Sequence, residues 1–586
     1  MKSAMNPITA FKRLLCLAAI GLLAACAQPA PVVASRTPAP SHTPTATATQ
    51  TPKPTATPTA LPLQVTGDLR AGLLAQPISQ PNAPCGVVDL LDFPVGLPDG
   101  EGYGGQGSFG IYRDRYNGIH AGEDWGISGG ASLGQPVYSI GHGTVTYAQP
   151  LGWGIDRGVV IVRHLFPDGS TFLSFYGHLD PPSVVLQPGD CVARGEQVGA
   201  IGKPRGRPHL HFEIRTHMPD QPGPGYWPVD PRLAGWLEPS TTIWDYRAQS
   251  SPGVAWMHSF TTGFSTAIGL LNDETLAAIV DRQLVGFDAR DGSLRWSRPV
   301  SRTLSSALLD ANGAAIYLAN LRGSVEAIDA SGASVWQLSL AERGRAVLLP
   351  LPGGGIIAYF AEQLIGLSAT GARLWEIDFP AFPLTWALSD DQLFFTTGGE
   401  QPLLHRINRD GQLEALASIE GRPFVAGDQV YVLARAGVYR LEPETRTIQL
   451  IYPLDAGLLR DDNMAALPDG SLLLSHRGWA GQRLIWIDAD GVLRWDRSVA
   501  DLGLLPPRIV VAGEQVYAVA ETGQVLNIDL STGSARRVFD VGGTLRLAGA
   551  PWVYATANGR LLFDYRGGGI IALDPRLAVE AVGGAP

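Results

Sequence analysis

The chain has 586 residues, more than a single hydrophobic core usually accommodates, so we expect at least two domains joined by linkers. Its 44 lysines and arginines are outnumbered by 54 aspartates and glutamates, and its basic residues form no dense run. Because binding a phosphate backbone takes clustered positive charge, the composition excludes nucleic acid as a partner.

The N-terminus has the pattern of an export signal. Basic residues precede an apolar run from about Leu14 to Ala25, which is too short to span a bilayer. We therefore predict that residues 1–26 are a signal peptide. The run ends in Leu-Ala-Ala-Cys at Cys26, which resembles the bacterial lipoprotein signal. The resemblance implies a lipid on Cys26 and an exported protein, anchored on the outer face of the cytoplasmic membrane or in the cell envelope. An ordinary cleaved signal with a chance cysteine is the alternative.

The next segment, residues 27–63, consists mainly of Pro, Thr and Ala. Such a composition buries too little apolar surface to offset the entropy of ordering the chain. We predict a disordered tether. At roughly 3.1 Å per residue, an extended chain of this length reaches on the order of 100 Å, a distance that suits work within a cell wall.

Four cysteines occur in the chain. Cys16 lies in the predicted signal and Cys26 is the predicted lipid site, which leaves Cys85 and Cys191 for the folded part. Because exported proteins commonly pair such cysteines, we hypothesise a Cys85–Cys191 disulfide.

The residue types that bind metals gather between positions 120 and 217, where seven of the eleven histidines lie. Residues 208–215 alternate in the manner of a strand, so His209 and His211 project from one face. Upstream, His120 and Asp124 lie four residues apart and can converge on the same metal. Two imidazole nitrogens and one carboxylate leave a fourth tetrahedral position open, which is typical of catalytic zinc. Zinc in such a site activates water and polarises a carbonyl.

These segments resemble the lysostaphin-type (LytM-like) zinc endopeptidases of bacterial cell walls, which carry an H-x-x-x-D segment and a later H-x-H. The resemblance covers about 150 of the 586 residues and implies that peptide cross-links of peptidoglycan are the substrate. It also implies that His120, Asp124 and His211 bind one Zn²⁺ per chain. By the same resemblance, His209 is the general base and His178 is a second catalytic histidine that steadies the oxyanion.

Two positions depart from the family pattern. Many relatives have an apolar residue where this chain has Glu123, and a Ser/Thr-Gly pair before Pro-His where this chain has Arg205-Gly206-Arg207-Pro208. We expect Glu123 to face solvent, with a spare carboxylate near the metal as the alternative, and we expect the arginines to alter substrate choice. Two alternative functions stay open: a non-hydrolytic protein that binds the wall or activates another hydrolase, and a peptidase that acts on an envelope protein.

We predict an all-β fold throughout. Residues 64–245, with a core at about 85–235, form an antiparallel β peptidase domain of the lysostaphin type. Its expected strands are Val137–Ala148, Gly158–His164, Thr171–His178, Gln197–Ile201 and Leu210–Thr216. We expect His142 and His164, which lie at a turn and at a strand end, to be structural.

Beyond residue 250 the sequence repeats. Trp256, Trp296, Trp336 and Trp375 recur every 39 or 40 residues, and similar phrases continue with decay toward the C-terminus. A period near 40 is that of a propeller blade, and eight repeats predict an eight-bladed β-propeller over residues 250–586. A strand at Val254 to Phe260 would complete the last blade and hide both sheet edges. We expect the tryptophans to pack one blade against the next.

The repeats resemble pyrroloquinoline-quinone-type propeller repeats, which occur in quinoprotein dehydrogenases and in non-enzymatic scaffolds. No cysteine lies in this region, so the adjacent-cysteine disulfide of several quinoprotein alcohol dehydrogenases is absent. We therefore favour a scaffold that recruits a protein or polymer partner over a cofactor enzyme.

Overall fold

The computed structural model describes residues 60–66, 83–105, 108–260, 265–340, 344–399, 401–426, 428–455, 463–467, 469–478, 481–503, 507–541, 552–565 and 569–578. The predicted signal peptide, the predicted lipid site at Cys26 and most of the predicted tether lie outside these residues. Within the described ranges, no helix is both long enough and apolar enough to cross a membrane.

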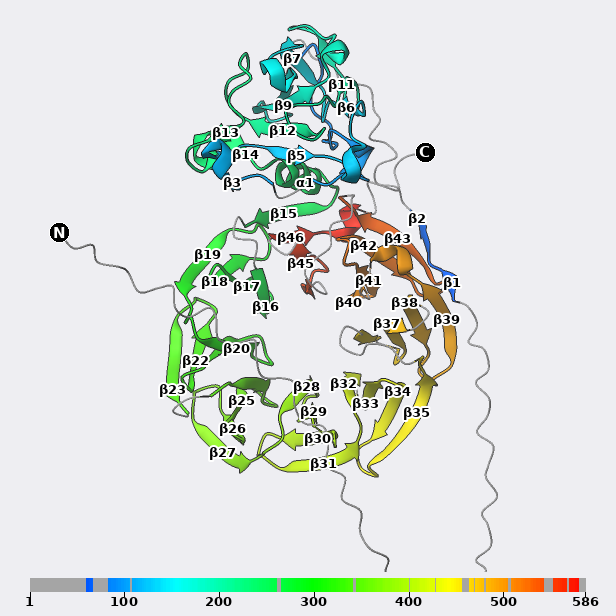
Figure 1. Cartoon of the computed structure of the whole chain (residues 1–586). Coiled ribbons are helices and arrows are strands. Elements are labelled where there is room, and N and C mark those ends of the chain that lie inside the picture. Colours follow the sequence, from blue (N-terminus) through cyan, green and yellow to red (C-terminus); the bar gives the residue numbers. More distant parts are fainter. Residues whose placement is uncertain are drawn as a thin grey trace, which may run out of the picture. The chain divides into compact units, whose positions relative to one another are not determined.

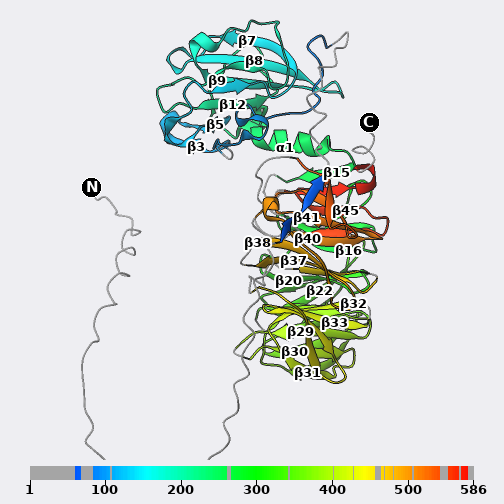
Figure 2. The same ribbon diagram turned by 90° about the vertical axis from the view of Figure 1, so that its right-hand side faces the viewer.

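Residues 83–249 form an N-terminal domain built on one seven-stranded sheet (Figure 2). Its order is β10-β7-β8-β9-β12-β14, and β5 also pairs with β12. These strands are β5 (Glu123–Trp125), β7 (Gly143–Gln149), β8 (Gly158–Leu165), β9 (Thr171–Leu179), β10 (Cys191–Val192), β12 (Leu210–Arg215) and β14 (Trp236–Leu237). All pairings in this sheet are antiparallel, as the resemblance to the lysostaphin-type family implies.

Two smaller sheets and several short helices complete the domain. The sheets are β6 (Pro136–Tyr138) with β11 (Gln197–Ala200), and β3 (Tyr112–Arg113) with β4 (Gly118–His120) and β13 (Tyr226–Trp227). The helices are η1 (Gly96–Gly100), η2 (Asp114–Tyr116), η3 (Ser128–Gly130), η4 (Gly154–Asp156), η5 (Pro181–Ser183), η6 (Pro231–Ala234) and α1 (Pro239–Gln249).

One expected strand was wrong. The segment Val137–Ala148 forms two strands, β6 and β7, in different sheets. The chain leaves the first sheet after Tyr138, and the Ile140 amide donates to the Tyr176 hydroxyl (3.0 Å) in place of a strand partner. Ile140 is fully buried there, so this apolar stretch had the appearance of a continuous strand.

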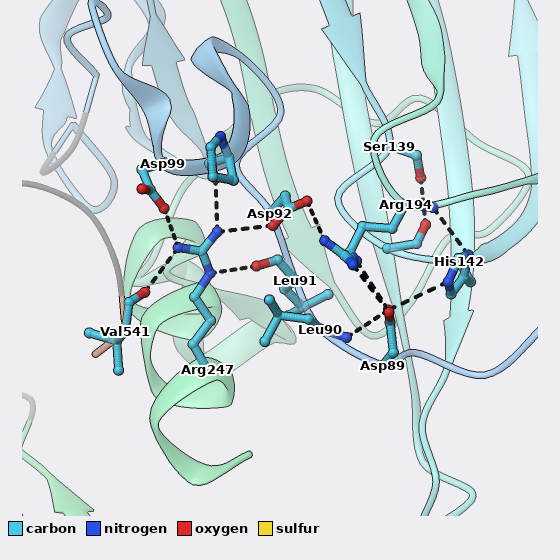
Figure 3. A network of polar contacts seen from close by, with 12 residues as sticks. Asp89, Leu90, Leu91, Asp92, Asp99, Ser139, His142, Arg194, Arg247 and Val541 are labelled. Carbon is cyan, nitrogen blue, oxygen red and sulfur yellow. Dashed lines mark hydrogen bonds and ion pairs between the residues drawn. The ribbon is translucent and has the colours of Figure 1, made fainter. Parts of the chain in front are cut away.

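An ion-pair network fastens α1 to the start of the domain (Figure 3). The Arg247 guanidinium on α1 contacts Asp92 at 3.2 Å and Asp99 at 2.6 Å. The other oxygen of Asp92 accepts from Arg194 at 2.7 Å, and Arg194 also contacts Asp89 at 3.1 Å. Because these arginines are almost fully buried and each meets two carboxylates, the network fixes α1 and the segment 89–99 in one arrangement.

The predicted disulfide is confirmed. Cys85 and Cys191 are bonded, and they join residues that are 106 positions apart in the sequence. The bond ties the first described residues of the N-terminal domain to β10, at the edge of the large sheet.

Beyond residue 250, the described strands form eight antiparallel sheets that succeed one another around a ring (Figure 1). The first four sheets contain β16 (Ser265–Leu271), β17 (Thr275–Val280), β18 (Gln283–Asp288), β19 (Leu294–Pro299); β20 (Leu304–Leu309), β21 (Ala315–Asn320), β22 (Ser324–Asp329), β23 (Ser334–Ser339); β24 (Val347–Pro350), β25 (Ile356–Phe360), β26 (Gln363–Leu367), β27 (Arg373–Asp378); β28 (Pro383–Leu388), β29 (Gln392–Thr397), β30 (Leu403–Asn408), β31 (Leu413–Ser418).

The other four sheets contain β32 (Gly421–Ala426), β33 (Gln429–Ala434), β34 (Gly437–Glu442), β35 (Thr447–Pro453); β36 (Asn463–Ala466), β37 (Leu472–Gly478), β38 (Gly481–Ile487), β39 (Leu493–Ser498); β40 (Arg508–Ala512), β41 (Gln515–Val519), β42 (Val525–Asp529), β43 (Ser534–Phe539); β44 (Val553–Ala555), β45 (Leu561–Tyr565), β46 (Gly569–Leu573), β15 (Val254–Ser259). A short helix, η7 (Ala500–Leu502), follows β39. As predicted, β15 pairs with β46 and completes the last sheet.

The repeated tryptophans pack one blade against the next, as the sequence predicted. The Trp296 indole N–H donates to the Ala330 carbonyl at 2.8 Å, and its ring lies over Gly332. A Cβ at Gly332 would lie 2.7 Å from Cδ2 of Trp296, so only glycine fits under the ring. Further pairs of this kind are Trp256 with Gly292, Trp336 with Gly371, Trp375 with Gly411 and Trp495 with Gly533.

Two short N-terminal strands belong to the propeller, which corrects the predicted domain boundary. β1 (Leu61–Pro62) pairs in parallel with β39, and β2 (Gln64–Thr66) pairs in parallel with β43. The sequence predicts that the tether ends at residue 63 and that the peptidase domain begins at residue 64. The physical reason is the alternation of this stretch: Leu63 and Val65 pack against the apolar residues of those two blades.

Candidate active site

The structure brings the three predicted metal ligands together. His120 ends β4, Asp124 is the central residue of β5, and His211 on β12 is the cross-strand partner of Asp124. His120 Nε2 lies 3.0 Å from His211 Nδ1 and 3.2 Å from Asp124 Oδ1. His211 Nδ1 lies 3.1 Å from the same carboxylate oxygen. Among the described residues, these three form a group that could hold a metal ion.

The spacing of these three atoms fits zinc. Bonds of about 2.0–2.1 Å at tetrahedral angles place neighbouring ligand atoms about 3.3 Å apart. The three separations of 3.0, 3.1 and 3.2 Å are close to that value. Two imidazoles with one carboxylate are also a donor set that zinc prefers, and the set leaves a coordination position for a reactant.

Each ligand imidazole is held by a hydrogen bond at its other nitrogen. His120 Nδ1 donates to the Ser108 carbonyl at 2.9 Å, and His211 Nε2 donates to Glu213 Oε1 at 2.9 Å. Glu213 is fully buried and also accepts from Trp236 Nε1 at 2.8 Å. These contacts fix the tautomer that leaves a lone pair on the inward-facing nitrogen of each ring.

The hydrogen bonds between these residues shift the pKa values of Asp124 and His211. Burial raises the pKa of Asp124, but hydrogen bonds from His120 and His211 outweigh it and hold the pKa well below its usual value. Burial likewise lowers the pKa of His211, yet its bonds to Asp124 and Glu213 raise that pKa to about 9. The site therefore keeps its carboxylate ionised and is poised to exchange a proton for a metal cation.

The two predicted catalytic histidines lie beside the three candidate metal ligands. His209 Nε2 is 3.6 Å from Asp124 Oδ1, and the His209 ring is 4.7 Å from the ring of His178, centre to centre. His209 Nδ1 donates to the Arg207 carbonyl at 2.7 Å, and His178 Nδ1 donates to the Asp156 carbonyl at 2.7 Å. In its neutral form, each ring therefore presents Nε2 as a proton acceptor.

His178 occupies an unusual position at the end of β9. Its backbone φ is +62°, a left-handed conformation that non-glycine residues seldom adopt. Burial lowers the pKa of His178 to about 3, and the neighbouring His209 and His211 reinforce this effect. His178 is thus a neutral ring held in a strained backbone against the site.

Two loops that carry these carbonyl groups are joined to one another. Arg205 Nε contacts both carboxylate oxygens of Asp156, at 3.0 and 3.1 Å, and the Arg205 amide donates to the same carboxylate. In the reverse direction, Arg157 Nε donates to the Lys203 carbonyl at 2.8 Å. We call these contacts the loop clasp.

Aromatic side chains wall the site. The Trp153 ring lies 5.0 Å from His178 and 5.2 Å from His211. The Tyr226 ring lies 5.1 Å from His120 and stacks on Tyr116 at 4.2 Å. Such walls offer apolar surface to a bound peptide chain.

Glu123 corrects a prediction, because it neither faces solvent nor reaches the metal ligands. Successive residues of a strand face opposite sides, so Asp124 faces the site while Glu123 faces the core with 0% exposure. Its carboxylate accepts from Ser240 Oγ at 2.6 Å and Trp125 Nε1 at 3.1 Å, which links β5 to α1. Burial raises the pKa of Glu123 to about 7, although these hydrogen bonds lower it in part.

The structural role expected for His142 and His164 agrees with their burial at 3% and 0% exposure. Sequence reasoning missed Glu213 and the loop clasp. Glu213 had a signal, because it lies two residues after His211 and so shares its strand face. The loop clasp had no such signal in the sequence, because Asp156 and Arg205 are 49 positions apart.

Comparisons with known proteins agree with this geometry. Residues 119–231 match peptidase family M23, and residues 241–381 and 321–576 match the family described as outer membrane protein assembly factor BamB. The BamB-type matches together span more than half of the chain. The chain belongs to this BamB-type repeat family and carries an M23 peptidase domain. Both family predictions made from the sequence are thereby confirmed.

The comparisons with individual proteins are more distant. No curated protein matches the sequence. Among solved structures, BamB from Moraxella catarrhalis is 15% identical, with a TM-score of 0.40, and covers 55% of this chain and 99% of its own. The WD40 domain of SCAP from fission yeast is 12% identical, with a TM-score of 0.40, and covers 53% of this chain and 94% of its own.

Proposed function

We propose that this protein is a cell-envelope zinc metalloendopeptidase that hydrolyses peptide cross-links of peptidoglycan. The observation that carries the proposal is the convergence of His120, Asp124 and His211 at the spacing of tetrahedral zinc ligands. His178 and His209 lie beside that point with their Nε2 atoms free to accept protons. A binding protein has no need of such a set.

Zinc held by the three ligands would act as a Lewis acid and make water a competent nucleophile near neutral pH. The chain's own residues move the proton. His209 is the general base, because the Arg207 carbonyl holds the proton on Nδ1 and leaves Nε2 to accept another. Asp124 stays ionised and orients both ligand imidazoles.

His178 has a later role than His209. Its Nδ1–H is committed to the Asp156 carbonyl, so a neutral His178 has no proton on Nε2 to offer an oxyanion. The expected oxyanion role therefore requires His178 to gain a proton during the reaction. The closeness of the two rings, 4.7 Å between centres, supports a transfer within the pair.

We further propose that the protein is exported and anchored by a lipid on Cys26, and that the propeller recruits a protein or polymer partner. The export pattern of residues 1–26 supports the first part. The second part rests on the ring of packed blades, a rigid platform that lies outside the catalytic domain in sequence.

The test is hydrolysis of purified peptidoglycan by the full-length chain in detergent, with zinc measured on the same sample. We expect new amino termini and about one zinc per chain. The His209→Ala variant should keep zinc and lose most turnover, whereas His211→Ala should lose both. Zinc without hydrolysis by the wild type would refute the proposal and favour a wall-binding or hydrolase-activating protein, or a peptidase for an envelope protein.

A further inference from the structure

Basic side chains border the active site on the segments that lead to its histidines. Arg113 and Arg115 precede His120, and Arg157 follows the residue whose carbonyl holds His178. Lys203, Arg205 and Arg207 precede His209. All of these except Arg157 are exposed, and Arg157 is partly buried.

The charge of this border differs in sign from that of the whole chain. Asp114 and Asp156 are the acidic residues within these three segments, so basic residues outnumber acidic ones there, although the chain carries a net charge of −10. Within the ranges that the structure describes, Arg205 is the one of the six with an ion pair, to Asp156. Arg115 lies over the Tyr116 ring, 5.5 Å from its centre.

The segments that carry these basic residues contact residues of the site. The Tyr226 ring adjoins His120 and stacks on Tyr116, and the Arg115 guanidinium lies over the Tyr116 ring. On the other side, the Arg207 carbonyl bonds directly to His209 and the Lys203 carbonyl is held by Arg157. The backbone of Arg207 is therefore held at His209, and that of Lys203 is held at Arg157. Both side chains are exposed, and neither forms an ion pair within the ranges that the structure describes.

We propose that the peptide bound by this site carries a carboxylate close to the scissile bond, and that Lys203 and Arg207 bind it. The inference rests on the proposed peptidase function and names its substrate class, an anionic peptide. Positive groups held beside the site attract an anionic chain and fix its register by charge-assisted hydrogen bonds. Arg205 does not take part, because the clasp already engages it.

The test compares three preparations of one peptidoglycan. The first is freed of phosphate-containing polymers, the second is the same material with its peptide carboxylates converted to primary amides, and the third retains the phosphate polymers. We expect the full-length chain to hydrolyse the first about tenfold faster than the second, since a hydrogen bond to a charged group is lost. Removing the phosphate polymers should leave the rate unchanged.

The double variant Lys203→Gln with Arg207→Gln should hydrolyse the first two preparations at rates within about twofold of each other, because the charged partners are gone. Arg163→Gln is the matched control. Arg163 is an exposed arginine on β8 opposite Leu173, about 16 Å along the strand from Gly158 at the end nearest His178. This variant should keep the tenfold preference of the wild type.

Equal wild-type rates on free and amidated wall would overturn the inference, as would a preference that survives in the double variant or that follows the phosphate polymers. Failure of the proposed function has a different signature, because the wild type would then hydrolyse none of the three. In that case, sedimentation of the His209→Ala chain with the first two preparations decides. More protein bound to the free wall supports carboxylate recognition, and equal binding refutes it.

Discussion

The guanidinium of Arg205 contacts both oxygens of the Asp156 carboxylate, and the main-chain carbonyl of Asp156 accepts the hydrogen bond of His178. The chain that carries Arg205 continues to Arg207, whose carbonyl accepts the hydrogen bond of His209. One ion pair therefore joins the two segments that orient the two proposed catalytic rings. Arg205 is a positioning residue in this arrangement, since it touches neither ring itself.

Replacing Arg205 tests that arrangement. We expect Arg205→Ala to lower kcat on soluble peptidoglycan fragments about fivefold to tenfold with KM and zinc content unchanged, because small displacements of catalytic groups are costly. The free energy of unfolding should change by less than about 1 kcal/mol, since the ion pair is exposed. Arg205→Lys should fall between wild type and Arg205→Ala, because an ammonium cannot contact both oxygens in the same way. An unchanged kcat in Arg205→Ala would contradict the positioning role.

Glu213 should tune metal affinity through His211. Glu213→Gln removes the charge that holds the Nε2–H of His211, and we expect zinc to bind about 10-fold to 100-fold more weakly. Competition with a chromogenic chelator measures this. Glu123→Gln is the matched control, because Glu123 is equally buried but bonds to Ser240 and Trp125 instead of a ligand. Equal zinc affinity in both variants would show that Glu213 does not support metal binding through His211.

His164 should make the N-terminal domain sensitive to acid. Burial lowers its pKa from 6.5 to about 4, against the hydrogen bond to the His142 carbonyl. The unfolded chain takes up a proton below about pH 6.5, whereas the folded chain does so only near pH 4, so the free energy of unfolding falls as the pH drops between these values. At pH 5 this loss is about 2 kcal/mol relative to pH 7.

Urea unfolding at pH 7 and pH 5 measures the acid effect. A His164→Gln variant should lose about 2 kcal/mol less than the wild type between the two pH values, because glutamine takes up no proton. The same pH dependence in both proteins would show that other groups cause the acid effect.

The propeller offers a matched pair of glycines. Gly332 and Gly523 both have φ +81°, but a Cβ would collide with Trp296 at Gly332 and meets nothing within 4 Å at Gly523. Gly523→Ala should cost about 1–2 kcal/mol, the cost of a left-handed alanine. Gly332→Ala should cost about 1–3 kcal/mol more, from overpacking against the indole. Calorimetric unfolding measures both, and equal losses would deny that the indole packing matters.

The site residues that could be predicted are those whose spacing is visible within a short stretch of sequence. His209 and His211 share a face because strand residues alternate, and His120 and Asp124 lie within one short segment. The spacing of the tryptophans predicted the blades, because each blade repeats the same contact with the next. In each case the signal lay within one segment or one repeat.

The features that the sequence did not reveal depend on partners far along the chain or on backbone atoms. The direction of Glu123 depends on the face of β5 that α1 covers, 117 positions away at Ser240. The carbonyl partners of His178 and His209 belong to backbone, which carries no residue-specific signal. Leu61 to Thr66 escaped notice because the proline and threonine of the preceding stretch dominated the composition.

The strands β1 and β2 decide where a pull on the N-terminus is resisted. Any tension that arrives through residue 60 meets the backbone hydrogen bonds of residues 61–66 with β39 and β43 before it can reach residue 83, where the described part of the N-terminal domain begins. Both pairings are parallel, so tension along the chain slides the strands past one another and strains several bonds together. A protein tethered at this end would bear stretching of the envelope with its propeller, and its metal ligands would keep their spacing.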